Sequence, residues 1–71
     1  MNATVAIARL GLEIAKMSRS CTPVPDRTFA MGMIEMAEFA DLIDLPTADR
    51  YRDALDAKFV QRNEQIKRSA A

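Results

Sequence analysis

Four carboxylates, Glu35, Glu38, Asp41 and Asp44, recur at every third residue in the middle of the chain. Paired carboxylates can act as general acid and general base when both reach the same reacting atom. On a helix, however, every third residue is rotated by about 60° relative to the one before, so these side chains spiral round the axis. The spacing therefore predicts a solvated acidic surface and not a catalytic pair.

Other side chains that could do chemistry are scarce. The chain has no histidine, and its single cysteine, Cys21, has no partner for an internal disulfide. A glycine-rich phosphate loop, a nucleophile with a nearby base and the spacing of metal ligands are all absent from the sequence. We therefore expect a protein that is not an enzyme, with no catalytic residue, no cofactor and no metal site.

Length and composition predict one small all-α domain over residues 1–71. Apolar residues make up 49% of the chain, but aromatic residues only 6%, and this composition favours close-packed helices. The N-terminal apolar run is interrupted by Arg9, Glu13 and Lys16, so it resembles neither a signal peptide nor a membrane span. With one free cysteine, these features predict a cytoplasmic protein that does not enter membranes.

Apolar periodicity and capping residues predict three helices, at about residues 2–19, 26–43 and 47–67, joined by a linker at 20–25. Pro23 and Pro25 are expected to keep that linker extended. Asp26 is the predicted N-cap of the second helix and Thr47 that of the third. In the predicted fold, a long hairpin of the second and third helices is covered by the first.

Each predicted helix carries at least one apolar seam. The seam residues are Val5, Ile7, Leu10, Leu12, Ile14 and Met17 in the first helix, Phe29, Met33, Met36 and Ile43 in the second, and Tyr51, Leu55 and Phe59 in the third. The first helix has apolar residues on two sides, and a helix of this kind is normally covered on more than one side. A homodimer that completes the bundle is therefore expected.

A second row on the middle helix, opposite its main seam, contains Met31, Glu35, Glu38 and Leu42. Two apolar anchors with carboxylates between them would suit a partner protein with a basic surface. This row is the predicted partner-binding face. The alternative is that Met31 and Leu42 pack inside the bundle.

The stretch FADLIDLPTADRYRDAL resembles the LAxLxGLPxxTVxRxLxxL segment of helix-turn-helix regulators of bacteria, which implies DNA binding. Two positions depart from that pattern, because Arg50 and Asp53 stand where the family has buried apolar residues. The net charge is zero, and Asp49, Asp53 and Asp56 would repel phosphate. We therefore expect no binding to nucleic acid and keep the regulator as an alternative.

The longer stretch GMIEMAEFADLIDLPTADRYRDALDAKFVQR resembles small proteins from the early regions of bacteriophages and other mobile elements. Many such proteins inhibit host machinery by binding it. The resemblance implies a non-enzymatic inhibitor or modulator of a host protein, such as a transcriptional regulator or a nucleic-acid-binding complex. A structural accessory subunit is a further alternative.

Overall fold

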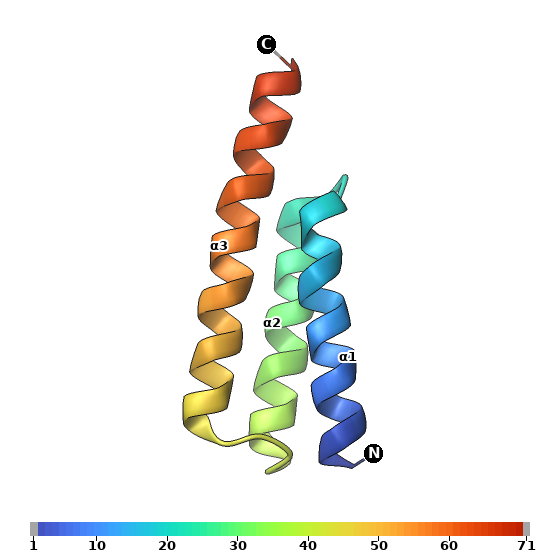
Figure 1. Ribbon diagram of the computed structural model, residues 1–71, viewed down its shortest axis with the longest axis vertical. Coiled ribbons are helices and arrows are strands. Elements are labelled where there is room, and N and C mark those ends of the chain that lie inside the picture. Colours follow the sequence, from blue (N-terminus) through green and yellow to red (C-terminus); the bar gives the residue numbers. More distant parts are fainter. Residues whose placement is uncertain (1, 71) are drawn as a thin grey trace.

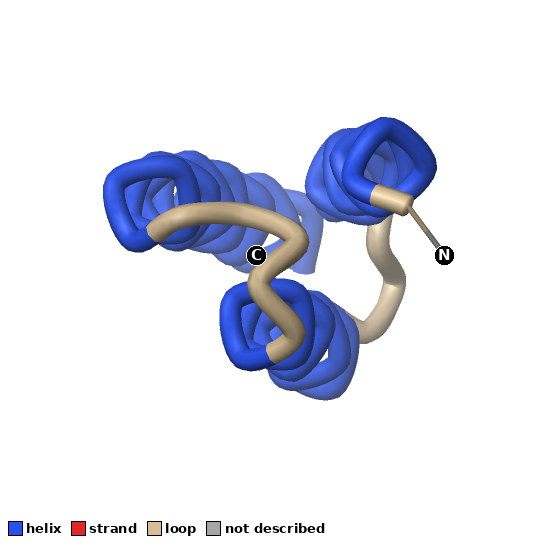
Figure 2. The backbone as a smooth tube through the Cα atoms, turned by 90° about the horizontal axis from the view of Figure 1, so that it is seen from below, coloured by secondary structure: helices blue, strands red, loops and turns tan. Residues whose placement is uncertain are grey.

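The computed structural model describes residues 2–70 as three helices and one short helical turn. The helices are α1 (Ala3–Lys16), α2 (Pro23–Phe39) and α3 (Leu45–Ala70), and the 3-10 turn η1 (Met17–Arg19) follows α1 directly. They lie side by side, and α3 extends beyond the other two toward the C-terminus (Figure 1). Seen along the bundle, the three helices form a triangle (Figure 2). The expected all-α fold, with α1 packed on a hairpin of α2 and α3, is confirmed.

The first helix begins at Ala3, one residue after the predicted start, and Asn2 is its N-cap. The Oδ1 atom of Asn2 accepts a hydrogen bond from the backbone N–H of Val5 at 2.9 Å and so satisfies a donor of the first turn. At its other end the helix tightens into η1, which ends at Arg19. Together α1 and η1 cover residues 3–19, close to the predicted range of 2–19.

The second helix begins earlier than predicted, at Pro23, so the prolines do not hold the linker extended. Pro23 and Pro25 lie in the first turn of α2, where backbone N–H groups lack a helical partner and a proline loses no hydrogen bond. Asp26 is consequently not the N-cap but a residue inside the helix. Its carboxylate accepts a hydrogen bond from the hydroxyl of Ser20, which fixes the short connection to η1.

The turn between α2 and α3 also differs from the prediction, because α2 ends at Phe39 and not near Ile43. Asp41 has a φ of 58°, and the N–H of Leu42 donates to the carbonyl of Ala37 at 2.9 Å, as in a Schellman C-cap. Asp44, and not Thr47, caps α3 by accepting the Thr47 N–H at 2.9 Å. Hydrogen bonds from the side chain and backbone of Thr47 hold the pKa of Asp44 below its usual value.

The buried face of α2 is formed by Ala30, Ile34 and Ala37, and not by the predicted seam of Phe29, Met33 and Met36. The two rows differ by one residue, a rotation of about 100° round the helix. Small residues on the buried row let α1 and α3 approach α2 from both sides. Phe29 and Met36 consequently lie outside, with 59% and 65% of their surface exposed.

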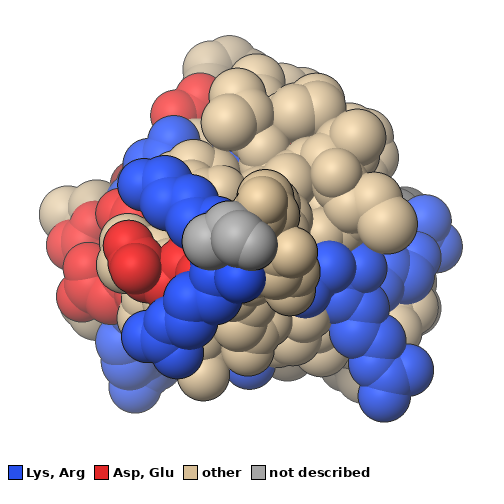
Figure 3. Space-filling view, turned by 90° about the horizontal axis from the view of Figure 1, so that it is seen from above, with Lys and Arg blue, Asp and Glu red and all other residues tan. Residues whose placement is uncertain are grey.

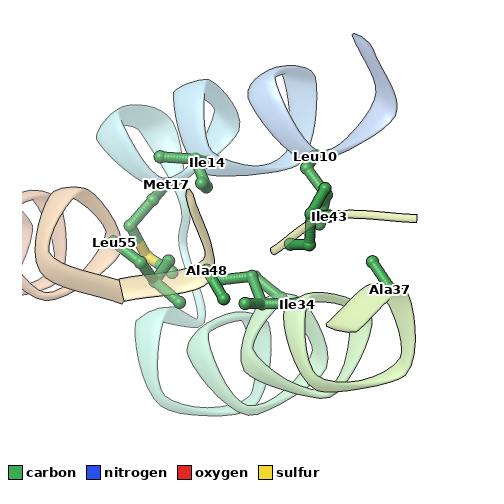
Figure 4. Packing of buried hydrophobic residues seen from close by; sticks show 9 residues of the cluster. Leu10, Ile14, Met17, Ile34, Ala37, Ile43, Ala48 and Leu55 are labelled. Carbon is green, nitrogen blue, oxygen red and sulfur yellow. The ribbon is translucent and has the colours of Figure 1, made fainter. Parts of the chain in front are cut away.

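Residues from all three helices and from the turn build one core (Figure 4). Its buried members are Leu10, Ile14, Met17, Ala30, Ile34, Ala37, Ile43, Ala48 and Leu55, and Met31, Met33, Leu42, Tyr51 and Phe59 pack against them while partly buried. From the two seams of the first helix, only Leu10, Ile14 and Met17 are buried. Val5, Ile7 and Leu12 are about half exposed, because α1 meets α2 and α3 along one side only.

Candidate protein-interaction surfaces

Two pockets follow one another along the junction of α1 and α2, and we call the two together the groove. The lower pocket, toward the N-terminus of α1, has a volume of about 290 Å³ and is lined by Ala6, Arg9, Leu10, Met33, Met36, Ala37, Ala40 and Leu42. The upper pocket, of about 300 Å³, is lined by Glu13, Lys16, Met17, Asp26 and Phe29. The α2 stripe that the sequence assigned to the core therefore lines this groove. Its spacing of three and four residues is the spacing by which a helix presents one side to a neighbour.

Four large apolar side chains lie on the groove side of α1 and α2, and we call them the apolar face: Val5, Leu12, Phe29 and Met36. Val5 and Leu12 stand four and three residues from Arg9, which lines the groove, so they share its side of α1. Phe29 and Met36 line the groove themselves, whereas Phe39, 86% exposed, follows Glu35 by four residues and lies on another side of α2. Single exposed apolar residues are common, but four on one side of the molecule form an exposed apolar patch.

The α1 edge of the groove carries charges that are largely neutralised within the helix. Glu13 forms ion pairs with Arg9 at 3.3 Å and with Lys16 at 3.2 Å, and only 13% of its side chain is exposed. Because the carboxylate is already paired, the groove presents apolar side chains with two half-exposed cations at one rim. Surface ion pairs of this kind contribute little to stability, about 0–1 kcal/mol.

The predicted partner-binding row does not form one exposed face: Glu38 lies at the junction of α2 and α3, whereas Leu42 follows the end of α2 and lines the groove. Met31 and Leu42 are partly buried and pack against the core, so they are not the exposed anchors that the sequence predicted. The row predicted to be buried on α2 lies about 100° round the helix from the row that is buried. The residues opposite the predicted row, such as Glu38, therefore face α3. Glu35 is exposed, whereas Glu38 is partly buried and bound to α3.

Ion pairs between α2 and α3 cross this junction. Arg52 binds Glu38 at 2.6 Å and Asp49 at 3.0 Å, and the Glu38 carboxylate raises the pKa of Arg52 above its ordinary value. Further along, Arg27 binds Asp56 at 2.7 Å, and its guanidinium lies 5.3 Å from the ring centre of Phe59. These contacts set the register of the hairpin on its solvent side.

The hairpin thereby gathers five carboxylates, which we call the acidic face: Glu35, Glu38, Asp49, Asp53 and Asp56. Glu35 precedes Glu38 by three residues, so these two side chains lie on the same side of α2. Asp53 follows Asp49 by four residues, so these two lie on the same side of α3. Arg27, Arg50 and Arg52 lie among them, which leaves a net charge of −2. Seen from the end of the bundle, acidic side chains gather on one side and a broad uncharged area lies on another (Figure 3).

The arrangement of α2 and α3 differs from that of a helix-turn-helix. In that motif the two helices cross at roughly 90–120°, whereas α2 and α3 lie side by side along the bundle (Figure 1). Arg50 and Asp53, which occupy positions that are apolar and buried in the motif, are both exposed. The sequence resemblance thus falls on a helical hairpin of another shape.

Comparison with protein-family models, with curated proteins and with solved structures found no match to the chain. Within residues 2–70, no helix combines the length and apolar character that crossing a membrane requires. The same residues contain no group of three or more histidine, cysteine or acidic side chains placed to hold a metal ion.

Proposed function

We propose that this protein is a non-enzymatic protein-interaction module that binds another protein through its exposed apolar face. The apolar face carries this proposal. Burial of a large apolar side chain contributes about 1.5–3 kcal/mol, and this chain leaves four of them at least half exposed on the groove side of α1 and α2. A domain of 71 residues has only a small core, so covering this face also supports its stability.

The face is tested by adding a charge at its centre. Met36→Glu should abolish complex formation in extracts of cells that express the chain, because association would bury a carboxylate without a partner. Native size-exclusion chromatography with immunodetection measures the size of the complexes. We expect the wild type well above its monomer mass of 7.9 kDa and the variant shifted toward that mass.

The matched control is Val60→Glu, which adds the same charge at a similarly exposed apolar residue on α3, away from the groove. This control should elute with the wild type. A wild-type chain that elutes as a monomer, or a Met36→Glu chain that elutes like the wild type, would refute the proposal.

For the kind of protein bound, we propose a host protein with a basic surface, on which the chain acts as a small inhibitor of the phage type. The acidic face supports this partner chemistry, because opposite potentials steer and orient association. A nucleic-acid-binding surface is a basic surface of this kind. When the acidic face of this chain is bound there, its five carboxylates would compete with the phosphates of the nucleic acid. Inhibition would then be a direct result of binding.

Charge reversal tests this partner chemistry at positions that do not hold the fold. Glu35→Lys and Asp53→Lys should each reduce capture of partner proteins from host lysate about tenfold or more, while the unfolding temperature stays nearly unchanged. Both side chains are exposed, and among the described residues neither forms an ion pair. Glu38 is less suitable, since its replacement would also break the bond to Arg52.

Glu64→Lys is the matched control, because it makes the same charge change at an exposed residue on the extended end of α3. Capture by this control should equal that of the wild type, and capture by the wild type should fall as salt screens the charges. Equal capture by Asp53→Lys and Glu64→Lys would rule out the acidic face as the binding surface.

A further inference from the structure

We infer that a second copy of this chain covers the apolar face, with the two bundles side by side and antiparallel. The inference rests on the proposed function, since it names the protein that occupies the face. It leaves the acidic face free, because that face lies at the α2/α3 junction and the groove lies between α1 and α2. One chain could then pair with itself and still bind a different protein.

The exposed area is sufficient for a small dimer interface. The four residues of the apolar face are 50–65% exposed, and because large apolar side chains bury up to roughly 150–250 Å² each, the four together expose on the order of 400 Å². A standard interface buries roughly 800 Å² on each partner, including a polar rim. The remaining area would come from the polar walls of the groove, among them Arg9 and Lys16.

The distribution of charge along the bundle selects the antiparallel orientation. Residues 35–53, at the hairpin end, contain six acidic side chains and two arginines, a net charge of −4. Residues 16–27 and 56–70, toward the other end of this 44 Å long bundle, together carry a net charge of +4. Two antiparallel copies place each acidic end beside a basic end, whereas two parallel copies place like charges together.

The residues of the α2 stripe fit the same symmetry. Phe29 and Ala40 stand at the two ends of this stripe, about 16 Å apart along the helix. A two-fold axis perpendicular to α2 and passing between them brings the large Phe29 of one copy toward the small Ala40 of the other. Met33 and Met36 then lie near the axis, where flexible thioether side chains can adapt to a copy of themselves.

Sedimentation velocity of the purified chain tests the dimer. We expect the wild type and the Val60→Glu control at twice 7.9 kDa at micromolar concentration. Met36→Glu should raise the dimer dissociation constant by about a hundredfold or more and retain its helical circular dichroism, because Met36 is 65% exposed in the single chain. A monomeric wild type, or a dimer that Met36→Glu does not weaken, would overturn the inference.

Disulfide trapping tests the orientation in a chain carrying Cys21→Ser. Asp26→Cys and Ala40→Cys place thiols at exposed positions that line the upper and lower parts of the groove. A mixture of the two single-cysteine chains should cross-link to each other faster than either cross-links to itself. Preferential self-linking of each chain would show a parallel pair and overturn the antiparallel arrangement.

The outcomes separate this inference from the proposed function. If the purified chain is a monomer but its complexes in cell extract still depend on Met36, the face binds another protein and only the second copy is excluded. If the chain is a monomer in both settings, both statements fail.

Discussion

Replacing Ile34 with alanine should lower the free energy of unfolding by about 2–5 kcal/mol. Ile34 has no exposed surface and belongs to the cluster that joins all three helices. The shortened side chain would leave a cavity, because residues from three helices surround the site and cannot all move inward. Native domains have about 0.05–0.15 kcal/mol of stability per residue, so this one change removes a large fraction of the total.

Urea unfolding followed by circular dichroism, at one fixed protein concentration, measures the effect. Val60→Ala is the control, since Val60 lies on α3 with 59% of its surface exposed. The control should change stability by less than about 1 kcal/mol. If the two variants unfold at the same urea concentration, Ile34 does not occupy the core.

Enlarging Ala48 to leucine should destabilise the protein by about 1–3 kcal/mol. Ala48 lies in the first turn of α3 and is completely buried in the same cluster. Leucine has nearly the helix propensity of alanine, so the loss would report steric crowding and not a weaker helix. The three additional carbon atoms would force α3 away from its neighbours or into strained rotamers.

Ala54→Leu provides the comparison, because it makes the same change at an exposed position of the same helix. Thermal unfolding should place this variant close to the wild type and Ala48→Leu several degrees lower. Equal melting temperatures for the two leucine variants would show that α3 does not pack through Ala48.

The bounds of α2 show why local sequence rules gave only part of the fold. Pro23 and Pro25 indicated a break, but the first turn of a helix accepts proline without losing a hydrogen bond. At the other end, the left-handed C-cap position is usually glycine, and here it is Asp41. Both ends were therefore misplaced, although the existence of the helix followed directly from its apolar periodicity.

The candidate surfaces were harder to predict, because they depend on the rotation of α2. The rows 29, 33, 36 and 30, 34, 37 have the same spacing, and the first contains the larger apolar residues. Hydrophobicity alone therefore favoured Phe29 and Met36 for the core. With the wrong row inside, the opposite row, which includes Met31 and Leu42, was assigned to solvent.

From the residues alone, an all-α chain of three helices followed, and the sequence holds no side-chain pattern for metal, phosphate or nucleophilic chemistry. These properties depend on residues that are neighbours along the chain. Three further features could be seen only in the packed bundle: the inward orientation of the small residues Ala30 and Ala37, the groove beside the Phe and Met stripe, and the acidic face that two helices share. Close packing of α2 against two neighbours at once is a property of three helices together, and no single helix encodes it.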